Sequence, residues 1–119
     1  MSYKRIILEM GTGNDLYGED YTKAACRAVQ DALHHSSLSL FRTLDIDRES
    51  MQIDVTIGVQ KPELVDKQAV ADQVPFGSVT VLTTQGGLDV ADVDPNKVSV
   101  IAAAAIAVRL DLPEGRFIT

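Results

Sequence analysis

The amino-acid sequence predicts a single α+β domain in which a mixed four-stranded sheet carries two helices on one face. Three observations predict this class. Residues 51–59 alternate between apolar and polar side chains, residues 20–36 repeat apolar side chains at helical spacing, and segments of the two kinds follow one another along the chain. The expected order is strand, helix, strand, helix, strand, strand, all within one domain over residues 1–119.

The first strand is expected at residues 3–10, where apolar residues lie between polar ends, and it is expected to stop at Gly11 and Gly13. The helix at residues 20–36 has an apolar stripe made mostly of alanine: Tyr21, Ala24, Ala25, Ala28, Val29, Ala32 and Leu33. Because alanine is small, we expect this helix to approach the sheet closely.

The second strand is expected at residues 51–59, with one apolar face: Met51, Ile53, Val55, Ile57 and Val59. Pro62 follows at a position that suits the first turn of a helix. The apolar residues Val65, Ala69 and Val70 continue at helical spacing toward Val74 and Pro75. We therefore expect one helix over residues 62–74.

The third strand is expected at residues 76–84, and it breaks at the glycine pair that follows. Residues 98–110 are ambiguous, because Asp94 and Pro95 resemble a helix start. The β-branched side chains of this segment recur every second residue, as Val98, Val100, Ile106 and Val108. We predict a strand here, and a helix remains the alternative.

Two helices can cover only one face of such a sheet, and the last strand would be apolar on both sides. The second face is therefore expected to meet another subunit, so that the protein forms a homo-oligomer.

The composition excludes several classes of partner. The chain has 119 residues and a net charge of −6, and its basic residues are scattered, so nucleic acid and an anionic membrane would be repelled. The longest apolar run, residues 100–108, is far shorter than the roughly 20 residues that cross a bilayer. The one cysteine, Cys26, and the lack of a signal-peptide pattern favour the reducing cytoplasm.

The segment 11–29, GTGNDLYGEDYTKAACRAV, resembles the opening motif of an uncharacterised family of short conserved bacterial proteins. Members usually read Gly-x-Gly-x-Asp-x-His-Gly-Gln-Asp, then Thr-Lys-Ala-Ala and an Arg-Ala-Val helix. The segments GVQKPELVD at 58–66 and QGGL at 85–88 fit the same resemblance. Tyr17 stands where the family usually has His, and Glu19 stands where it usually has Gln. The resemblance therefore implies no particular activity for this chain.

The expected strand order also resembles the fold of the small trimeric chorismate mutases, whose relatives often bind ligands between subunits. This resemblance adds a trimer as one form that the homo-oligomer could take, and the sequence leaves the number of subunits open. It implies no particular reaction, since one fold hosts many functions.

The loop from Gly11 to Asp20 is the leading candidate for a site, because it joins the end of a strand to the start of a helix. We expect catalytic roles for Asp15 and Glu19, which would accept protons or hydrogen bonds, and for Lys23, which would neutralise an acidic group. The expected ligand-binding residues are Gly11, Gly13, Tyr17, Asp20, Thr22, Gln85, Gly86 and Gly87. The glycine spacing matches neither a phosphate-binding loop nor a dinucleotide-binding motif.

Structural roles compete with these assignments. Asp20 can cap the helix, Glu19 can complement the helix dipole, and Lys23 can simply be solvated. Gly86 and Gly87 can serve a tight turn, or their N–H groups can hold an oxygen atom of a ligand.

Neither a metal nor a cofactor is implied by the sequence. His34 and His35 are adjacent, so they would point about 100° apart on a helix and could not share a metal ion. The first hypothesis is binding of an unidentified compact polar metabolite at a subunit boundary, with acid–base or hydrolytic chemistry as the reaction class. The alternative is a non-catalytic oligomeric binding or regulatory protein.

Overall fold

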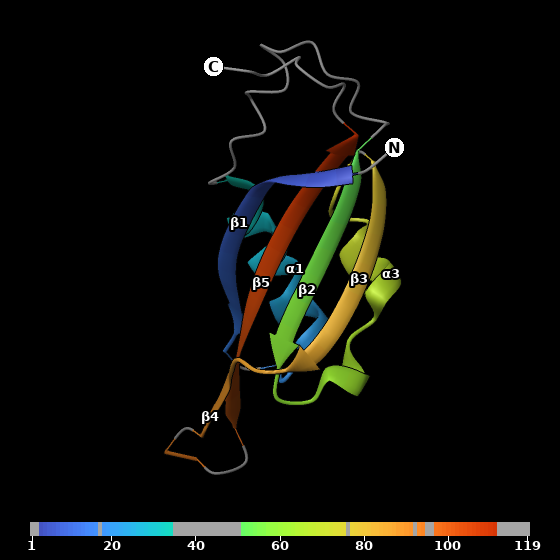
Figure 1. The fold of residues 1–119 in the computed structure, drawn as a ribbon. Coiled ribbons are helices and arrows are strands. Elements are labelled where there is room, and N and C mark those ends of the chain that lie inside the picture. Colours follow the sequence, from blue (N-terminus) through green and yellow to red (C-terminus); the bar gives the residue numbers. More distant parts are fainter. Residues whose placement is uncertain are drawn as a thin grey trace.

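The computed structural model describes residues 3–16, 18–34, 51–75, 77–91, 93–94 and 97–111. A mixed sheet of five strands forms one layer, and the helices form a second layer behind it (Figure 1). The elements follow in the order β1 (Tyr3–Asp15), α1 (Tyr21–His34), β2 (Gln52–Val59), the 3-10 helix η2 (Pro62–Leu64), α3 (Lys67–Ala71), β3 (Ser78–Gln85), β4 (Leu88–Ala91) and β5 (Val98–Asp111). The α+β class is confirmed, but the sheet has five strands instead of the four expected.

The last strand, β5, lies at the centre of the sheet, which has the order β1–β5–β2–β3. It is antiparallel to both β1 and β2, while β2 and β3 are parallel. Every second side chain of β5 is buried against the helices, including Val100, Ile106 and Val108. The prediction of a strand in this segment is thereby confirmed, and the helical alternative is wrong.

Helix α1 packs against β1 at very short range, as its alanine stripe predicts. Its buried side chains are Tyr21, Ala24, Ala25, Ala28, Val29 and Ala32. A Cβ atom on Gly11 would lie 2.4 Å from the backbone nitrogen of Ala32, and one on Gly13 would lie 2.3 Å from that of Ala28. The expectation that these glycines end the first strand is wrong, because β1 continues to Asp15 and needs them for contact with the helix.

The helix expected over residues 62–74 is also wrong, because two short helices occupy this segment. Val65 is extended between them, and the carboxylate of Asp66 accepts hydrogen bonds from the backbone N–H groups of Gln68 and Ala69 at 3.0 and 3.3 Å. Asp66 thus caps a new helix, α3. Helix α3 lies beside α1, where Gln30 Nε2 donates to Gln73 Oε1 at 2.7 Å.

Strand β4 was not expected from the sequence. All four of its residues are exposed, so no hydrophobic periodicity marks it. It pairs with the first part of β5, with Leu88 opposite Ile101, and the resulting hairpin extends beyond the ends of β2 and β3 (Figure 1).

Three further expectations have a simple outcome. The ends of the first helix at residues 35–36 and of the third strand at residue 76 lie outside the described residues. The alternation of β2 is confirmed, since Ile53, Val55, Ile57 and Val59 are buried. In the part of the chain that the structure describes, no helix is long and apolar enough to cross a membrane.

Candidate functional site

The turn between β1 and α1 is held together by two of the predicted site residues. Asp15 is only 6% exposed, and its Oδ2 accepts a hydrogen bond from the backbone N–H of Asp20 at 3.0 Å. Its Oδ1 lies 3.7 Å from Nη1 of Arg27. Asp20 caps α1, since its Oδ1 accepts from the backbone N–H of Lys23 at 3.0 Å. Both carboxylates therefore stabilise the start of the helix.

The remaining described candidates near this turn, Glu19, Thr22 and Lys23, have different surroundings. Glu19 is exposed and has a positive φ of 49°, an uncommon backbone conformation for a residue with a side chain. Thr22 joins two elements, because its Oγ1 accepts from the N–H of Asp66 at 2.8 Å and donates to the carbonyl of Leu64 at 3.4 Å. The side chain of Lys23 is exposed, and Tyr17 lies outside the described residues.

The Gln85–Gly87 turn lies at the same end of the molecule, where it packs against β2 and β5 (Figure 1). The N–H of Gly86 donates to the carbonyl of Val59 at 2.9 Å, so this donor is already engaged. Nε2 of Gln60 lies 3.1 Å from the carbonyl oxygens of both Gly86 and Gly87. Gly87 has a positive φ of 62°, and a Cβ there would lie 2.2 Å from the carbonyl oxygen of Ile101. These contacts favour the tight-turn role.

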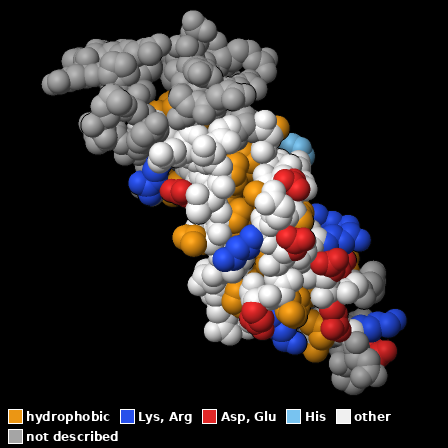
Figure 2. Space-filling model, turned by 90° about the vertical axis from the view of Figure 1, so that its right-hand side faces the viewer, with side chains coloured by type: hydrophobic (Ala, Val, Ile, Leu, Met, Phe, Trp, Pro, Cys, Tyr) orange, Lys and Arg blue, Asp and Glu red, His pale blue; other side chains and the backbone are white. Residues whose placement is uncertain are grey.

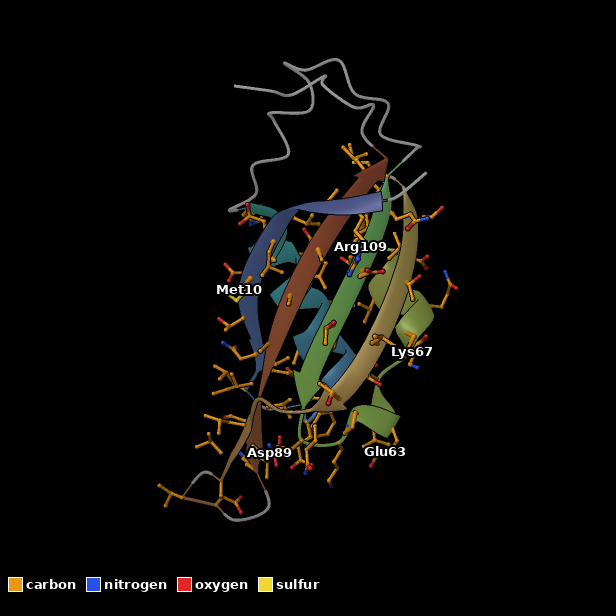
Figure 3. All side chains as sticks on the ribbon, viewed as in Figure 1. Met10, Glu63, Lys67, Asp89 and Arg109 are labelled. Carbon is orange, nitrogen blue, oxygen red and sulfur yellow. The ribbon has the colours of Figure 1, made fainter. Side chains whose placement is uncertain are left out.

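Tyr21 connects α1 to the base of the β4–β5 hairpin by a hydrogen bond from its hydroxyl to Oδ2 of Asp89. Burial raises the pKa of Tyr21 to about 12, and the hydrogen bond to Asp89 and the negative charges of Asp89, Glu19 and Glu63 act in the same direction. Figure 3 shows Glu63 and Asp89 at this same end of the molecule. The sequence analysis missed this link, because Asp89 belongs to the unexpected strand.

Cys26 is partly buried beside α3, where its Sγ donates to the carbonyl of Ala69 at 3.7 Å. Burial raises the pKa of the Cys26 thiol, and the nearby carboxylates of Asp20, Asp66 and Asp72 raise it further. A thiol with a raised pKa is a poor nucleophile. Among the described residues, moreover, no group of three His, Cys, Asp or Glu side chains is arranged to hold a metal ion.

No described element covers the face of the sheet that points away from the helices, and we call it the open face. The strand register sets its side chains in rows, and one row carries two large apolar side chains: Met10, Ala105, Thr56 and Leu82. Met10 is 70% exposed and Leu82 is 58% exposed. The described side chains of this face include one acid and one base, Asp54 and Arg109, which pair at 2.8 Å.

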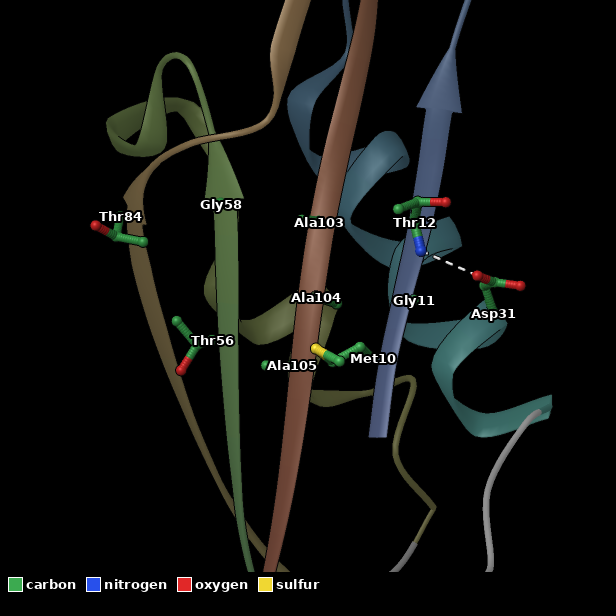
Figure 4. Close-up of a pocket in the computed structure, with 10 residues that line it drawn as sticks. All are labelled: Met10, Gly11, Thr12, Asp31, Thr56, Gly58, Thr84, Ala103, Ala104 and Ala105. Atoms are coloured by element: carbon green, nitrogen blue, oxygen red, sulfur yellow. Dashed lines mark hydrogen bonds between the residues drawn. The ribbon is translucent and has the colours of Figure 1, made fainter. Parts of the chain in front are cut away.

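The next row of the open face consists of small residues, namely Thr12, Ala103, Gly58 and Thr84. These residues form the floor of a shallow hollow of about 570 Å³ (Figure 4). Met10 and Thr56 of the first row stand beside it, and at the β1 edge Asp31 accepts a hydrogen bond from the N–H of Thr12 at 2.9 Å. Of the predicted site residues that the structure describes, Gly11 alone lines this hollow.

The residues of the open face were not chosen as candidates from the sequence. The alternation of β2 identifies Thr56 and Gly58 as outward residues, and that of β3 does the same for Thr84. Their assembly into rows depends on which strands are neighbours, and no local pattern in the sequence carries that information.

Comparison with known proteins places the chain among uncharacterised relatives. Residues 5–108 match the profile of a family described as "Conserved hypothetical protein (Lin0512_fam)". The crystal structure of an FtsZ-like protein of unknown function from Nostoc punctiforme is similar, with a TM-score of 0.82 and 32% sequence identity over 94% of this chain and 99% of that chain. No curated protein matches the chain. The expected relationship to an uncharacterised conserved family is confirmed.

Proposed function

We propose that this chain, which belongs to the Lin0512_fam family of conserved hypothetical proteins, is a homo-oligomeric, non-catalytic binding protein whose subunits meet through the open face. The observation that carries the proposal is the uncovered, nearly uncharged surface around Met10 and Leu82. Burial of one such side chain contributes roughly 1.5–3 kcal/mol. The charges of Asp54 and Arg109 neutralise each other, so the described side chains of this face offer a second subunit no unpaired charge, although the chain has a net charge of −6.

The bonding of the β1–α1 turn supports a non-catalytic function. The carboxylates of Asp15 and Asp20 accept hydrogen bonds from backbone N–H groups, and these bonds stabilise the conformation of the turn. A general base would instead need a carboxylate oxygen directed at a substrate proton. Among the described candidate residues of the turn, Glu19 and Lys23 have exposed side chains that could still contact a ligand.

The number of subunits that we expect is three, because the element order resembles that of the small trimeric chorismate mutases. The cytoplasm is the compartment in which we expect this assembly to act, since the chain has one cysteine, which fits a reducing environment.

Sedimentation velocity tests the subunit contact. The unmodified protein should sediment as an oligomer at micromolar concentration, and Met10→Lys should weaken the association at least about tenfold, which corresponds to roughly 1.4 kcal/mol. Leu64→Lys is the matched control, because Leu64 is 56% exposed on η2, away from the open face. A monomeric unmodified protein, or equal effects of the two lysines, would contradict the proposal.

A second candidate function, small-molecule binding in the hollow, is favoured by its size. Its volume of about 570 Å³ lies in the range of ligand sites, roughly 300–1,000 Å³. A second subunit over the open face would cover the hollow, and its floor of small residues suits a compact ligand.

Thermal-shift screening with compact, uncharged metabolites tests this second function. A ligand of the hollow should raise the melting temperature of the unmodified protein, and Ala103→Leu, which fills the floor, should abolish the shift. Ala107→Leu is the control, since Ala107 faces the same side of β5 outside the hollow. Shifts that survive Ala103→Leu would place the ligand elsewhere.

A further inference from the structure

The two outer edges of the sheet differ in how their backbone is protected. At the β1 edge, side chains of α1 bind outward-pointing backbone groups. Asp31 accepts from the N–H of Thr12 at 2.9 Å, and Nη1 of Arg27 donates to the carbonyl of Asn14 at 2.7 Å. Charged side chains of this kind are a common means of blocking an edge strand against further pairing.

Strand β3 lies at the opposite edge, and no described side chain protects it in this way. Its sequence, SVTVLTTQ, contains neither a charged residue nor proline, and it pairs with β2 without a bulge from Ser78 to Gln85. Valine and threonine favour extended chain. Among the described strands, none lies on the outer side of β3, so its outer row of N–H and C=O groups lacks a sheet partner. Figure 2 shows the molecule from this side.

The helix-facing side chains of β3 are also incompletely covered. Val79 and Val81 are only partly buried, although they pack against the core. Their neighbours one strand further in, Ile53 and Val55, are fully buried. The core is therefore left open at this edge, where a further strand would cover both valines.

We infer that β3 is the docking edge for a second copy of this chain, whose own β3 adds antiparallel across a two-fold axis. Side chains that face one another in an antiparallel pair lie on the same side of the sheet. With the axis at Val81, Thr80 lies opposite Leu82 of the partner subunit, and Ser78 lies opposite Thr84 of the partner subunit. The two Val81 side chains then meet on the helix-facing side of the continuous sheet that the two subunits form.

The charges at this edge favour a second copy as the occupant. Because β3 is uncharged, self-pairing sets no like charges opposite one another, which is the usual obstacle in a chain with a net charge of −6. Helix α3 lies on the same side of the molecule (Figure 3), with Lys67 at its first residue and Asp72 directly after its last. Asp66, Lys67 and Asp72 give this helix charges of both signs, so a second copy related by a two-fold axis brings both signs to the contact.

This contact goes beyond the proposed function, because it uses an edge of the sheet that the open-face contact leaves free. The two contacts involve different residues, so each can exist without the other.

Disulfide trapping tests the pairing. In a Cys26→Ser background, Ser78→Cys and Thr84→Cys are made as two separate proteins. Opposite positions of an antiparallel pair lie about 4.5–5.5 Å apart between Cα atoms, within disulfide reach. In this register, the two copies of position 78 are six residues apart along the strands, or roughly 20 Å, and so are the two copies of position 84. Cysteines at the same position in both subunits therefore cannot form a disulfide. An oxidised mixture should therefore give a disulfide-linked dimer, whereas each protein alone stays monomeric on a non-reducing gel.

Lack of a dimer in the mixture, or equal dimer in each protein alone, would overturn the inference. Hydrogen exchange of the protein without cysteine substitutions gives an independent measurement. Amides of β3 should become more protected as the protein concentration rises, and this should persist in Met10→Lys, which removes the open-face contact only. Exchange in β3 that is independent of concentration would also overturn the inference.

Discussion

Glycine at position 13 is required by the packing of α1 and not by backbone conformation. A Cβ there would lie 2.3 Å from the backbone nitrogen of Ala28 and 2.5 Å from the carbonyl oxygen of Ala24, and neither atom can move without shifting the helix. We expect Gly13→Ala to destabilise the fold by about 1–3 kcal/mol, measured by urea unfolding. Gly58→Ala is the control, because its Cβ would meet its nearest neighbour at an ordinary 3.4 Å. Equal losses for both variants would contradict this explanation.

The hydroxyl of Tyr21 gives the protein a predicted sensitivity to alkaline pH. The folded state holds the phenol proton up to a pKa of about 12, while the unfolded chain releases it near the ordinary value of 10.0. The stabilisation is therefore complete below pH 10 and is lost as the pH rises toward 12. Tyr21→Phe should lower the unfolding free energy by roughly 1 kcal/mol near neutral pH.

The comparison that checks this prediction is the difference in unfolding free energy between the unmodified protein and Tyr21→Phe. This difference should be constant up to pH 10 and should shrink above it, since the variant lacks the titrating group. A difference that does not change over the alkaline range would rule out the link between Tyr21 and stability.

At the scale of elements, the long periodic segments could be predicted and the short ones could not. The alternation from Met51 to Val59 and the alanine stripe of α1 each involve enough residues to define one buried face. In contrast, Asp66 interrupts the expected second helix, because its carboxylate caps a helix that starts one residue later. Strand β4 is held by its backbone pairing with β5 and all four of its side chains are exposed. Its sequence therefore shows no hydrophobic alternation from which a strand could be predicted.

The cap of α3 gives a prediction at this scale. Asp66→Ala removes the acceptor for two backbone N–H groups of a five-residue helix and should destabilise the protein by about 1 kcal/mol. Hydrogen exchange should show the loss first in α3. Asp72→Ala is the matched control at the other end, where the carboxylate accepts from the Gln68 side chain at 2.8 Å, and a smaller effect is expected. A larger effect at Asp72 would contradict the capping role.

The candidate site was less predictable than the fold, because its parts come together through register. Carboxylates in a loop, such as those of Asp15 and Asp20, are natural candidates for a catalytic or binding role. In the structure, both accept hydrogen bonds from backbone N–H groups at the start of α1. Thr12, Ala103 and Gly58 carry no chemical signature, and they share a surface only because β5 lies between β1 and β2.

At the scale of the whole molecule, self-association would couple stability to concentration. A ligand that binds only the folded state at a hundred times its dissociation constant stabilises that state by about 2.7 kcal/mol, and a second subunit acts in the same way. The melting temperature of the unmodified protein should therefore rise with protein concentration in differential scanning calorimetry. Met10→Lys should flatten this dependence, and a melting temperature that is independent of concentration would count against assembly.

The central position of β5 affects how the chain can fold during synthesis. Strands β1 and β2 have no ladder with each other, since residues 98–111 form the partner of both. A nascent chain that ends before this segment holds α1, a β1 without its strand partner, and the parallel pair β2–β3, which lacks its neighbour on the β2 side. The two halves of the sheet can therefore join only after β5 has been made, and this long-range pairing is the step that completes the sheet.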